Sequence, residues 1–484
     1  MQRMKQSLLS KEVLTIVLLV AVTFLSLLLP SKIALIVTSL IFAIFAFIKP
    51  LQSVLYLLIY VAIRPLLVEL NPGLKFIGDL ITFILLIKLL IASRFDIKGL
   101  LHFKLFEWAF FFFLGVGSLV GYLNGVSIGA IVFQVRTFVI MYLVYYFLSR
   151  TVLPANWKEQ LSWTAVGLGW LVSLHGLVEK ISIRQWLLPE YWQYMPLSAE
   201  NLQRIYGLPG NPNSLALIMM FTVIAVLFLK NLYKNMQYKW FLNISLVLFI
   251  GVLILTFSRG TLIAGAFFAV TYLIFSRDWK LVKTLAIGWL AAFILVYYPV
   301  NASVSFVKYL GVEAPDGTVG SLADRFGQIL DNKNVDRMVS NGRVFYIKKG
   351  FEIYQDYPVA GTGFGTFGGA ATISYGSPIY ADYGIDLSIY FENKIYSDNQ
   401  YIQIIAETGT LGVILFAVYL LAMVALFWKQ RHTRFGQMML GLWIATGVCG
   451  AFYNIWELKV YTLIFFTIFA AFAVEHKFYK QYRV

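Results

Sequence analysis

An arginine at the start of a predicted helix is the first residue whose position suggests chemistry. At helical spacing Arg343 falls on one face with the apolar residues that follow it, whereas Lys348 and Lys349 fall on the opposite face. The predicted apolar face consists of Ile347, Gly350, Phe351 and Tyr354. Asn341, just upstream, can cap this helix. An inward-facing guanidinium needs an anionic partner, so we expect Arg343 to meet a carboxylate or an anionic ligand.

Two further arginines lie in short polar connections. Arg259 occupies the turn Ser258-Arg259-Gly260 between two apolar segments. Arg204 begins the stretch Arg-Ile-Tyr-Gly-Leu-Pro-Gly-Asn-Pro-Asn, which leads into another apolar segment. Asn213 or Ser214 can cap that segment, so capping explains Asn213 but leaves Arg204 unexplained. For Arg259 the simpler alternative is a side chain that reaches lipid headgroups.

Acidic residues follow at the end of the long polar region. Ser397-Asp-Asn-Gln400 has the form of a capping box, which would place Asp398, Asn399 and Glu407 in the first turns of the next helix. A carboxylate within hydrogen-bond reach of a hydroxyl can act as a general base. A position in the first helical turn would stabilise the charged form of Asp398 and weaken it as a base. The alternative is that Asp398 only caps the helix and orients Arg343 or Arg259.

The segments that contain these residues belong to a chain with the composition of an integral membrane protein. Of its 484 residues, 60% are hydrophobic and 13% are charged, and apolar runs long enough to cross a bilayer recur throughout. The sequence predicts an all-α polytopic membrane protein with about fourteen transmembrane helices. The expected spans are 13–29, 33–48, 51–68, 76–92, 105–123, 126–148, 160–178, 213–230, 240–257, 260–276, 281–299, 402–428, 435–453 and 457–475.

The distribution of charge predicts the orientation of these spans. Basic residues concentrate in alternate connections, which is the pattern that keeps those connections in the cytoplasm. Both termini are therefore expected inside, and both large loops, 179–212 and 300–400, outside. This divides the chain into an N-terminal transmembrane bundle (1–178), an external loop with four helices (179–299), a large external loop (300–400) and C-terminal helices with a tail (401–484).

Two arginines are predicted within the spans themselves. Arg64 lies inside the third span, and Arg136 lies near the middle of the sixth. Intramembrane charges are costly and by default suggest a functional site, so both are candidates for substrate binding. The alternative is a structural role, in which they bind backbone carbonyls or pair with Asp79.

Several function classes are disfavoured by what the sequence contains. The net charge of +15 follows the connections between spans rather than one binding face, which argues against a nucleic-acid partner. The single cysteine, Cys449, excludes a disulfide framework, and the four histidines are scattered, which disfavours a zinc site. We therefore expect no metal and no other cofactor.

Four segments together resemble the O-antigen ligase and O-antigen polymerase family of bacterial membrane glycosyltransferases, over roughly residues 200–428. The matching residues are Arg204, Gly207 and Asn211 to Asn213; Arg259; Arg343, Pro358, Gly361, Gly363 and Gly365; and Asn399, Glu407, Gly409 and Gly412. The chain departs from the ligases at Asp398, where they carry histidine.

The resemblance implies transfer of a glycan from an undecaprenyl diphosphate carrier to an acceptor hydroxyl on the outer face of the cytoplasmic membrane. It implies Arg259 and Arg343 as catalytic residues, and Arg204, Asn213, Asn399 and Glu407 as substrate-binding residues. To these we add Asp398 as a catalytic residue, from its carboxylate, and Arg64 and Arg136 as substrate-binding residues, from their positions within the predicted spans. We expect a polymerase of lipid-linked repeat units, of O-antigen, teichuronic-acid or capsule type, working beside a flippase and a chain-length regulator. A ligase that transfers glycan to lipid A core or protein is the close alternative, and an exporter of polysaccharide or lipid is the alternative of a different class.

Overall fold

The protein is all-α in the part of the chain that the structure covers. The computed structural model describes residues 2–195, 197, 199–233, 238–310, 342–388 and 396–484. Within these ranges there is no β-strand, only an isolated bridge between Thr151 and Tyr482. The predicted all-α class is thereby confirmed, the count of about fourteen transmembrane helices stays a prediction, and the predicted cap Asn341 lies outside the described residues.

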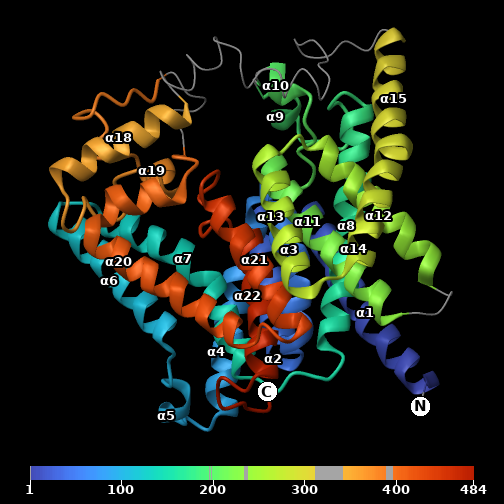
Figure 1. Ribbon diagram of the computed structural model, residues 1–484, viewed down its shortest axis with the longest axis horizontal. Helices are drawn as coiled ribbons and strands as arrows, with labels where there is room; N and C mark the ends of the chain where they lie inside the picture. Colours follow the sequence, from blue (N-terminus) through green and yellow to red (C-terminus); the bar gives the residue numbers. More distant parts are fainter. Residues whose placement is uncertain (1, 196, 198, 234–237, 311–341, 389–395) are drawn as a thin grey trace.

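A helix occupies each of the expected apolar segments (Figure 1). The first seven are α1 (Gln2–Leu25), α2 (Ser31–Ile48), α3 (Pro50–Leu70), α4 (Ile77–Ala92), α6 (Leu105–Leu123), α7 (Ile128–Ser149) and α8 (Trp157–Ile181). The others are α11 (Pro212–Leu232), α12 (Lys239–Leu255), α13 (Arg259–Ser276), α14 (Trp279–Ala292), α20 (Gln400–Lys429), α21 (Arg434–Gly450) and α22 (Lys459–Glu475). Shorter helices lie in the connections: α5 (Ile97–Leu100), α9 (Glu190–Gln193), α10 (Ala199–Leu202), α15 (Tyr298–Tyr309), α18 (Arg343–Asp356) and α19 (Ala370–Tyr375).

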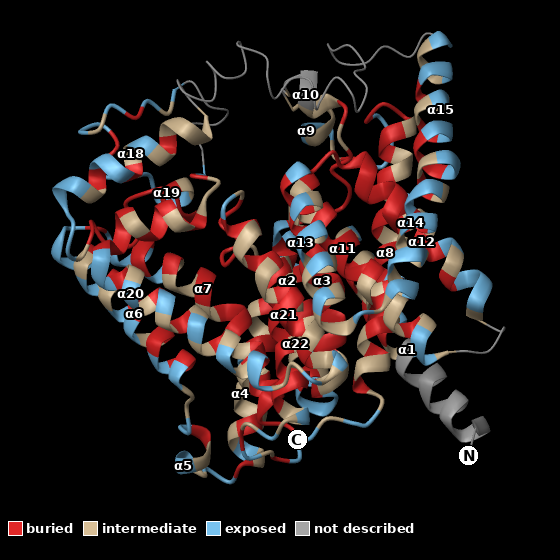
Figure 2. Ribbon diagram, in the orientation of Figure 1, coloured by how far each residue is buried: buried red, intermediate tan, exposed pale blue. Residues whose placement is uncertain are grey.

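The composition of these helices identifies a membrane protein. Among the described residues, nine helices are long and apolar enough to cross a membrane by length and composition. On α2 the exposed side chains are large, apolar and spaced at helical intervals, as expected of a face in contact with lipid. They are Ile33, Ile36, Leu40, Ile41, Ile44, Phe47 and Ile48. Buried residues concentrate instead in the middle of the bundle (Figure 2).

The bundle has two distinct ends (Figure 1). Both termini lie at one end, which we call the terminus end. Helices α9, α10, α18 and α19 lie at the opposite end, which we call the loop end. The C-terminal helices bind earlier parts of the chain, because α20 packs along α6, α21 along α13 and α22 along α7. Loops that are far apart in sequence therefore meet at the loop end.

One expected boundary is wrong. The eleventh span was predicted to end at 299, but α14 continues through a π-helical turn, Phe293–Tyr297, into α15, which ends at Tyr309. Pro299 lies in the first turn of α15, directly after the π-helical turn, where the regular α-helical hydrogen-bond pattern that a proline would break is already interrupted. The proline therefore does not end the helix, and the loop begins about ten residues later than expected.

A buried ion pair fixes the terminus end. The Glu107 carboxylate lies 3.4 Å from the Arg150 guanidinium, and both side chains are fully buried. The hydroxyls of Tyr142 and Tyr479 each donate to Glu107 at 2.7 Å. Since Tyr479 belongs to the C-terminal tail, this cluster binds the tail to α6 and α7, far from the loop end.

Candidate active site at the loop end

The pair formed by Arg343 and Asp398 is the centre of the candidate site. Arg343 is the first residue of α18, and its Nη2 and Nε lie 3.2 and 3.4 Å from Oδ2 of Asp398. The anionic partner expected for Arg343 is thus a carboxylate of the protein. The side chains remain 39% and 46% exposed, respectively, so a ligand can reach both.

Helix α18 packs against α20, but the residues that form the packed face are shifted by about one position along the sequence from those predicted. The buried residues are Tyr346, Gly350 and Ile353, whereas Phe351 is 48% exposed. Gly350 lies so close to Ile402 of α20 that a Cβ atom on residue 350 would clash with that side chain. The predicted face was therefore correct at Gly350 and wrong at Phe351. Arg343 still lies two turns before Gly350, at the edge of the packed face.

The predicted capping box is also wrong. The N-cap of α20 is Asn399, whose Oδ1 accepts from the backbone N–H groups of Tyr401 and Ile402 at 3.0 and 3.1 Å. Asparagine is among the strongest N-cap residues, so it satisfies the helix end without help from Ser397. Asp398 consequently precedes the helix, with a positive φ of 49°. Such a backbone conformation is uncommon outside glycine and points to a local constraint.

The surroundings of Asp398 favour its protonated form more than water would. Crowding by the surrounding protein raises the pKa of Asp398 above its usual range, while the charges of Arg343 and Arg204 oppose this rise. Asp398 is thus a stronger base than an ordinary exposed aspartate. The influence of Arg204 also places a second arginine within electrostatic range of the same carboxylate.

Arg204 belongs to a network of hydrogen-bonded polar side chains near the Arg343–Asp398 pair. Its Nη2 donates to Oδ1 of Asn213 at 2.6 Å, and its Nε donates to the backbone carbonyl of Thr256 at 2.9 Å. Ser258 Oγ donates to the same Asn213 oxygen at 3.0 Å and lies 2.8 Å from the hydroxyl of Tyr453. The loops before α11 and α13 are thereby joined to the segment after α21.

The Asn213 side chain can join this hydrogen-bond network because it does not cap α11. The N-cap is Asn211, which accepts from the backbone N–H groups of Asn213 and Ser214, so the predicted cap is wrong. Arg259 follows Ser258 directly as the first residue of α13, and it is exposed. The structure therefore brings Arg204, Asn213 and the turn that carries Arg259 to the same end of the bundle as Arg343 and Asp398.

Glu407 has a different environment from the residues above. It is 1% exposed, and its Oε1 accepts from the backbone N–H groups of Gly365, Thr366 and Phe367 at 2.8, 3.0 and 3.2 Å. The structure thus places this predicted substrate-binding residue as the anchor of the glycine-rich loop 358–369.

The glycines of this loop allow its backbone to approach two helices. Gly363 has a φ of +92°, and a Cβ atom there would lie 2.0 Å from the backbone nitrogen of Gly121 on α6. Gly361 has a φ of +70°, and a Cβ atom there would lie 2.4 Å from the backbone carbonyl carbon of Glu407 on α20. Only glycine fits such contacts, so the Gly-x-Gly-x-Gly pattern fixes the loop between α6 and α20.

A second buried acid, which was not predicted from the sequence, lies beside Glu407. Glu457, between α21 and α22, accepts from Gln134 and Gln403 at 2.5 Å each and from the backbone of Ala370 at 2.7 Å. Gln403 also donates to Glu407 at 3.1 Å and so links the two carboxylates. Its position as a charged residue between two apolar segments could have identified Glu457 as a candidate from the sequence.

Replacing Glu407 with alanine should loosen the glycine-rich loop. Three buried N–H groups would lose their acceptor, at a cost of about 1–3 kcal/mol each. Thermal unfolding of the purified variant in detergent should therefore begin at lower temperature, and proteases should cut the loop faster. Glu407→Gln keeps an acceptor oxygen and is the matched control, with a smaller effect. Unchanged melting and proteolysis in Glu407→Ala would contradict this role.

Arg64 and Arg136 lie in a separate cluster. Arg136 forms an ion pair with Asp79, and Nε of Arg64 donates to the backbone carbonyl of Lys75 at 3.3 Å. These contacts are those expected of a structural role, and they leave part of both side chains exposed, so substrate binding by these arginines stays a prediction. No described contact joins either arginine directly to Arg343 or Asp398.

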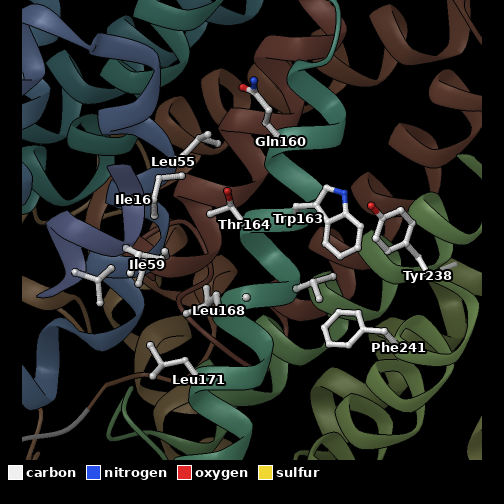
Figure 3. A pocket seen from close by; sticks show the side chains of 14 residues that line it. Ile16, Leu55, Ile59, Gln160, Trp163, Thr164, Leu168, Leu171, Tyr238 and Phe241 are labelled. Carbon is white, nitrogen blue, oxygen red and sulfur yellow. The ribbon is translucent and has the colours of Figure 1, made fainter. Parts of the chain in front are cut away.

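A large cavity lies elsewhere in the bundle. It has a volume of about 480 Å³ and lies between α1, α3, α8 and α12 (Figure 3). Its walls are mostly apolar, with Gln160 and Thr164 as polar exceptions. It therefore shares no residue with the polar cluster around Asp398.

Comparison with known proteins adds one relationship. Residues 244–417 match the family described as O-antigen ligase. The matched segment includes Arg259, α18 with Arg343, the glycine-rich loop, and Asp398 to Glu407. None of the curated proteins matches the chain.

Proposed function

Since the chain carries a segment of the O-antigen ligase family at residues 244–417, we propose that it is a polymerase of lipid-linked glycan repeat units. The donor is a glycan on undecaprenyl diphosphate, and the acceptor is a sugar hydroxyl of a second lipid-linked unit. The observation that carries this proposal is the accessible Arg343–Asp398 pair, with Arg204 in electrostatic range of Asp398 and linked through Asn213 to Ser258, the residue before Arg259. It combines cations for a diphosphate with a carboxylate for a hydroxyl proton.

In the proposed reaction the acceptor oxygen attacks the anomeric carbon of the donor. The new carbon–oxygen bond forms as the bond from the anomeric carbon to the phosphate oxygen breaks. Its electron pair leaves on the diphosphate, whose negative charge grows in the transition state. Arg343 and Arg259 stabilise that charge, and preorganised cations of this kind are usually the largest single contribution to catalysis. No metal is required for this step.

Arg343 can serve Asp398 and the diphosphate together. A guanidinium has five N–H donors, and the contacts to Asp398 involve Nε and Nη2. Arginine also binds phosphate oxygens in bidentate geometry, which lysine cannot do. Arg204 contributes less directly, because Thr256 and Asn213 hold its side chain.

Asp398 accepts the proton of the attacking hydroxyl. Its raised pKa makes the carboxylate a better base than a typical aspartate, and its exposed surface lets an acceptor approach. The ligases of this family carry histidine here, so aspartate supports a different acceptor. This favours the polymerase over transfer to lipid A core or protein.

We propose that all fourteen long helices cross the cytoplasmic membrane, with the terminus end inside and the loop end outside. The support is the alternation of basic connections and the position of both termini at one end (Figure 1). A flippase would then deliver the lipid-linked unit to the loop end, and a chain-length regulator would act on the growing product there.

Cysteine labelling should reveal this orientation. In intact cells an impermeant thiol reagent should modify a cysteine at Asp382, which lies in the loop before α20. The same reagent should not modify a cysteine at Lys280 near the start of α14, although both positions are exposed. Labelling at position 280 without permeabilisation would contradict the orientation.

The function is tested with purified protein in liposomes, given lipid-linked repeat units and a metal chelator. Products longer by whole repeat units support the proposal. Transfer only to added lipid A core would identify a ligase instead. Movement of lipid-linked glycan across the bilayer without covalent transfer would identify an exporter.

A further inference from the structure

A second group of cations lies at the loop end, outside the site described above. Arg64 is near the end of α3, Arg136 is in α7, and Lys459 begins α22. Arg136 is paired with Asp79 of α4, Arg64 donates to the backbone of Lys75 just before α4, and α22, which Lys459 begins, packs against both α7 and α3, so these four side chains form one cluster. We call Arg64, Arg136, Lys459 and Asp79 the α3–α22 cluster. Its three cations and one carboxylate leave an excess of two positive charges.

The cluster is built between packed helices rather than on a solvated loop. Helices α3, α4, α7 and α22 contact one another, and each contributes a charged residue. Arg136 and Asp79 keep 32% and 28% of their side-chain surface exposed, and Arg64 and Lys459 are half-buried. Charges at such depth are costly without counter-charges, so an excess of cations indicates an anionic ligand.

The anion that fits this position is a phosphate group carried by a lipid. Arg64 and Arg136 can each bind phosphate oxygens in bidentate fashion. The side chains of the cluster are only partly buried, so a ligand can reach them. The basic residues of the chain otherwise favour the terminus-end connections, so this concentration stands out from the overall charge pattern.

The cluster is also connected to the glycine-rich loop. Lys459 follows Glu457 by two residues, and Arg136 follows Gln134 by two residues. Glu457 and Gln134 accept from the backbone N–H groups of Ala370 and Ala371, directly after that loop. A ligand on the cluster would therefore lie beside the scaffold that holds α20 and Asp398.

We propose that the α3–α22 cluster binds the diphosphate of a second lipid-linked glycan, the acceptor, while Arg343 and Arg259 bind that of the donor. This inference rests on the proposed function, because a polymerase needs two lipid diphosphates at once, whereas a ligase needs one. The cluster thus holds the acceptor lipid, and its glycan extends to Asp398.

The test counts bound undecaprenyl diphosphate molecules on the purified protein by native mass spectrometry. Wild type should bind two. Arg64→Gln combined with Lys459→Gln should bind one at the same lipid concentration, because affinity at the cluster falls about tenfold or more. Arg343→Ala should also bind one, through loss of the other site. Lys308→Gln at the far end of α15 is the control cation and should still bind two.

Arg136 is tested together with its partner, since its removal alone would leave Asp79 without its ion pair. Asp79→Asn with Arg136→Gln removes both charges and should also reduce the number of bound lipids to one. Phosphatidylglycerol and inorganic diphosphate, added as competitors, should not displace the second lipid at equal concentration. Displacement by phosphatidylglycerol would assign the cluster to ordinary membrane lipid and overturn the proposal.

The number of bound lipids, measured together with polymer formation, distinguishes failure of the second lipid site from failure of the proposed function. A wild type that forms polymer yet binds one lipid, or cluster variants that still bind two, would overturn the acceptor site alone. A wild type that binds two lipids and forms no polymer would overturn the polymerase while leaving the second site in place.

Discussion

Arg343→Ala should reduce glycan transfer about 10²–10³-fold, which is the usual loss when one preorganised group facing developing charge is removed. Arg343 contacts Asp398 through a guanidinium that is 39% exposed and can also reach a ligand. Its loss would leave the departing diphosphate without a main counter-charge. The rate is measured as polymer formed from lipid-linked repeat units by equal amounts of purified protein.

Two matched variants interpret that loss. Arg343→Lys keeps the charge but not the bidentate geometry and should recover only part of the rate. Arg204→Ala should have a smaller effect than Arg343→Ala. Hydrogen bonds to Thr256 and Asn213 hold the Arg204 side chain, so it influences Asp398 only through its charge. Wild-type polymer from Arg343→Ala, with normal protein in the membrane, would remove this residue from the site.

Asp398→Asn should reduce transfer by about 10²–10⁴-fold, the range typical of a lost general base. The wild-type rate should fall as the pH falls through the pKa of Asp398, because the protonated form cannot accept a proton. Burial raises that pKa, so the decline should begin at a higher pH than for an ordinary aspartate, near 3.9. The variant should lose this acidic limb of the pH profile.

Asp398→His is the comparison for Asp398→Asn, because histidine is the residue of the ligases that the chain resembles. Asparagine preserves the size of the side chain without the base, whereas histidine restores a base of higher pKa. We expect partial activity for histidine, with the acidic limb moved towards neutral pH. An asparagine variant as active as wild type would mean that Asp398 is not the base.

The sequence predicted the positions of the long helices well, because apolar segments of this length leave a strong signal. The apolar runs placed a helix in each expected segment, with small errors at the ends. The clearest error was at Pro299, where a π-helical turn lets the helix continue to Tyr309. A proline is compatible with either outcome, and its position directly after the π-helical turn decided between them.

The site was predicted in part. Arg343 met the expected anion, and Asp398 proved to be that anion, because helical spacing and an unexplained charge are visible in sequence. The caps were misassigned, since several asparagines and serines stand close together at both helix starts. Asn211 and Asn399 take the caps and leave Asn213 and Asp398 for other contacts.

The role of Glu407 depends on tertiary structure that no local pattern contains. Its partners are backbone N–H groups of a loop about 40 residues earlier, and Glu457 approaches the same loop from a third segment. Spacing along the chain could place Glu407 on a helix, but it could not show that the carboxylate faces the loop backbone rather than a glycan.

A double-mutant cycle on Arg343 and Asp398 tests the central claim most directly. The rate of undecaprenyl diphosphate release per glycosidic bond is measured for wild type, Arg343→Ala, Asp398→Asn and the double variant. Residues that act as one catalytic unit give strongly non-additive losses. We predict that the double variant is about as slow as the slower single variant. Independent, additive losses, or a double variant with the wild-type rate, would contradict a catalytic pair at this site.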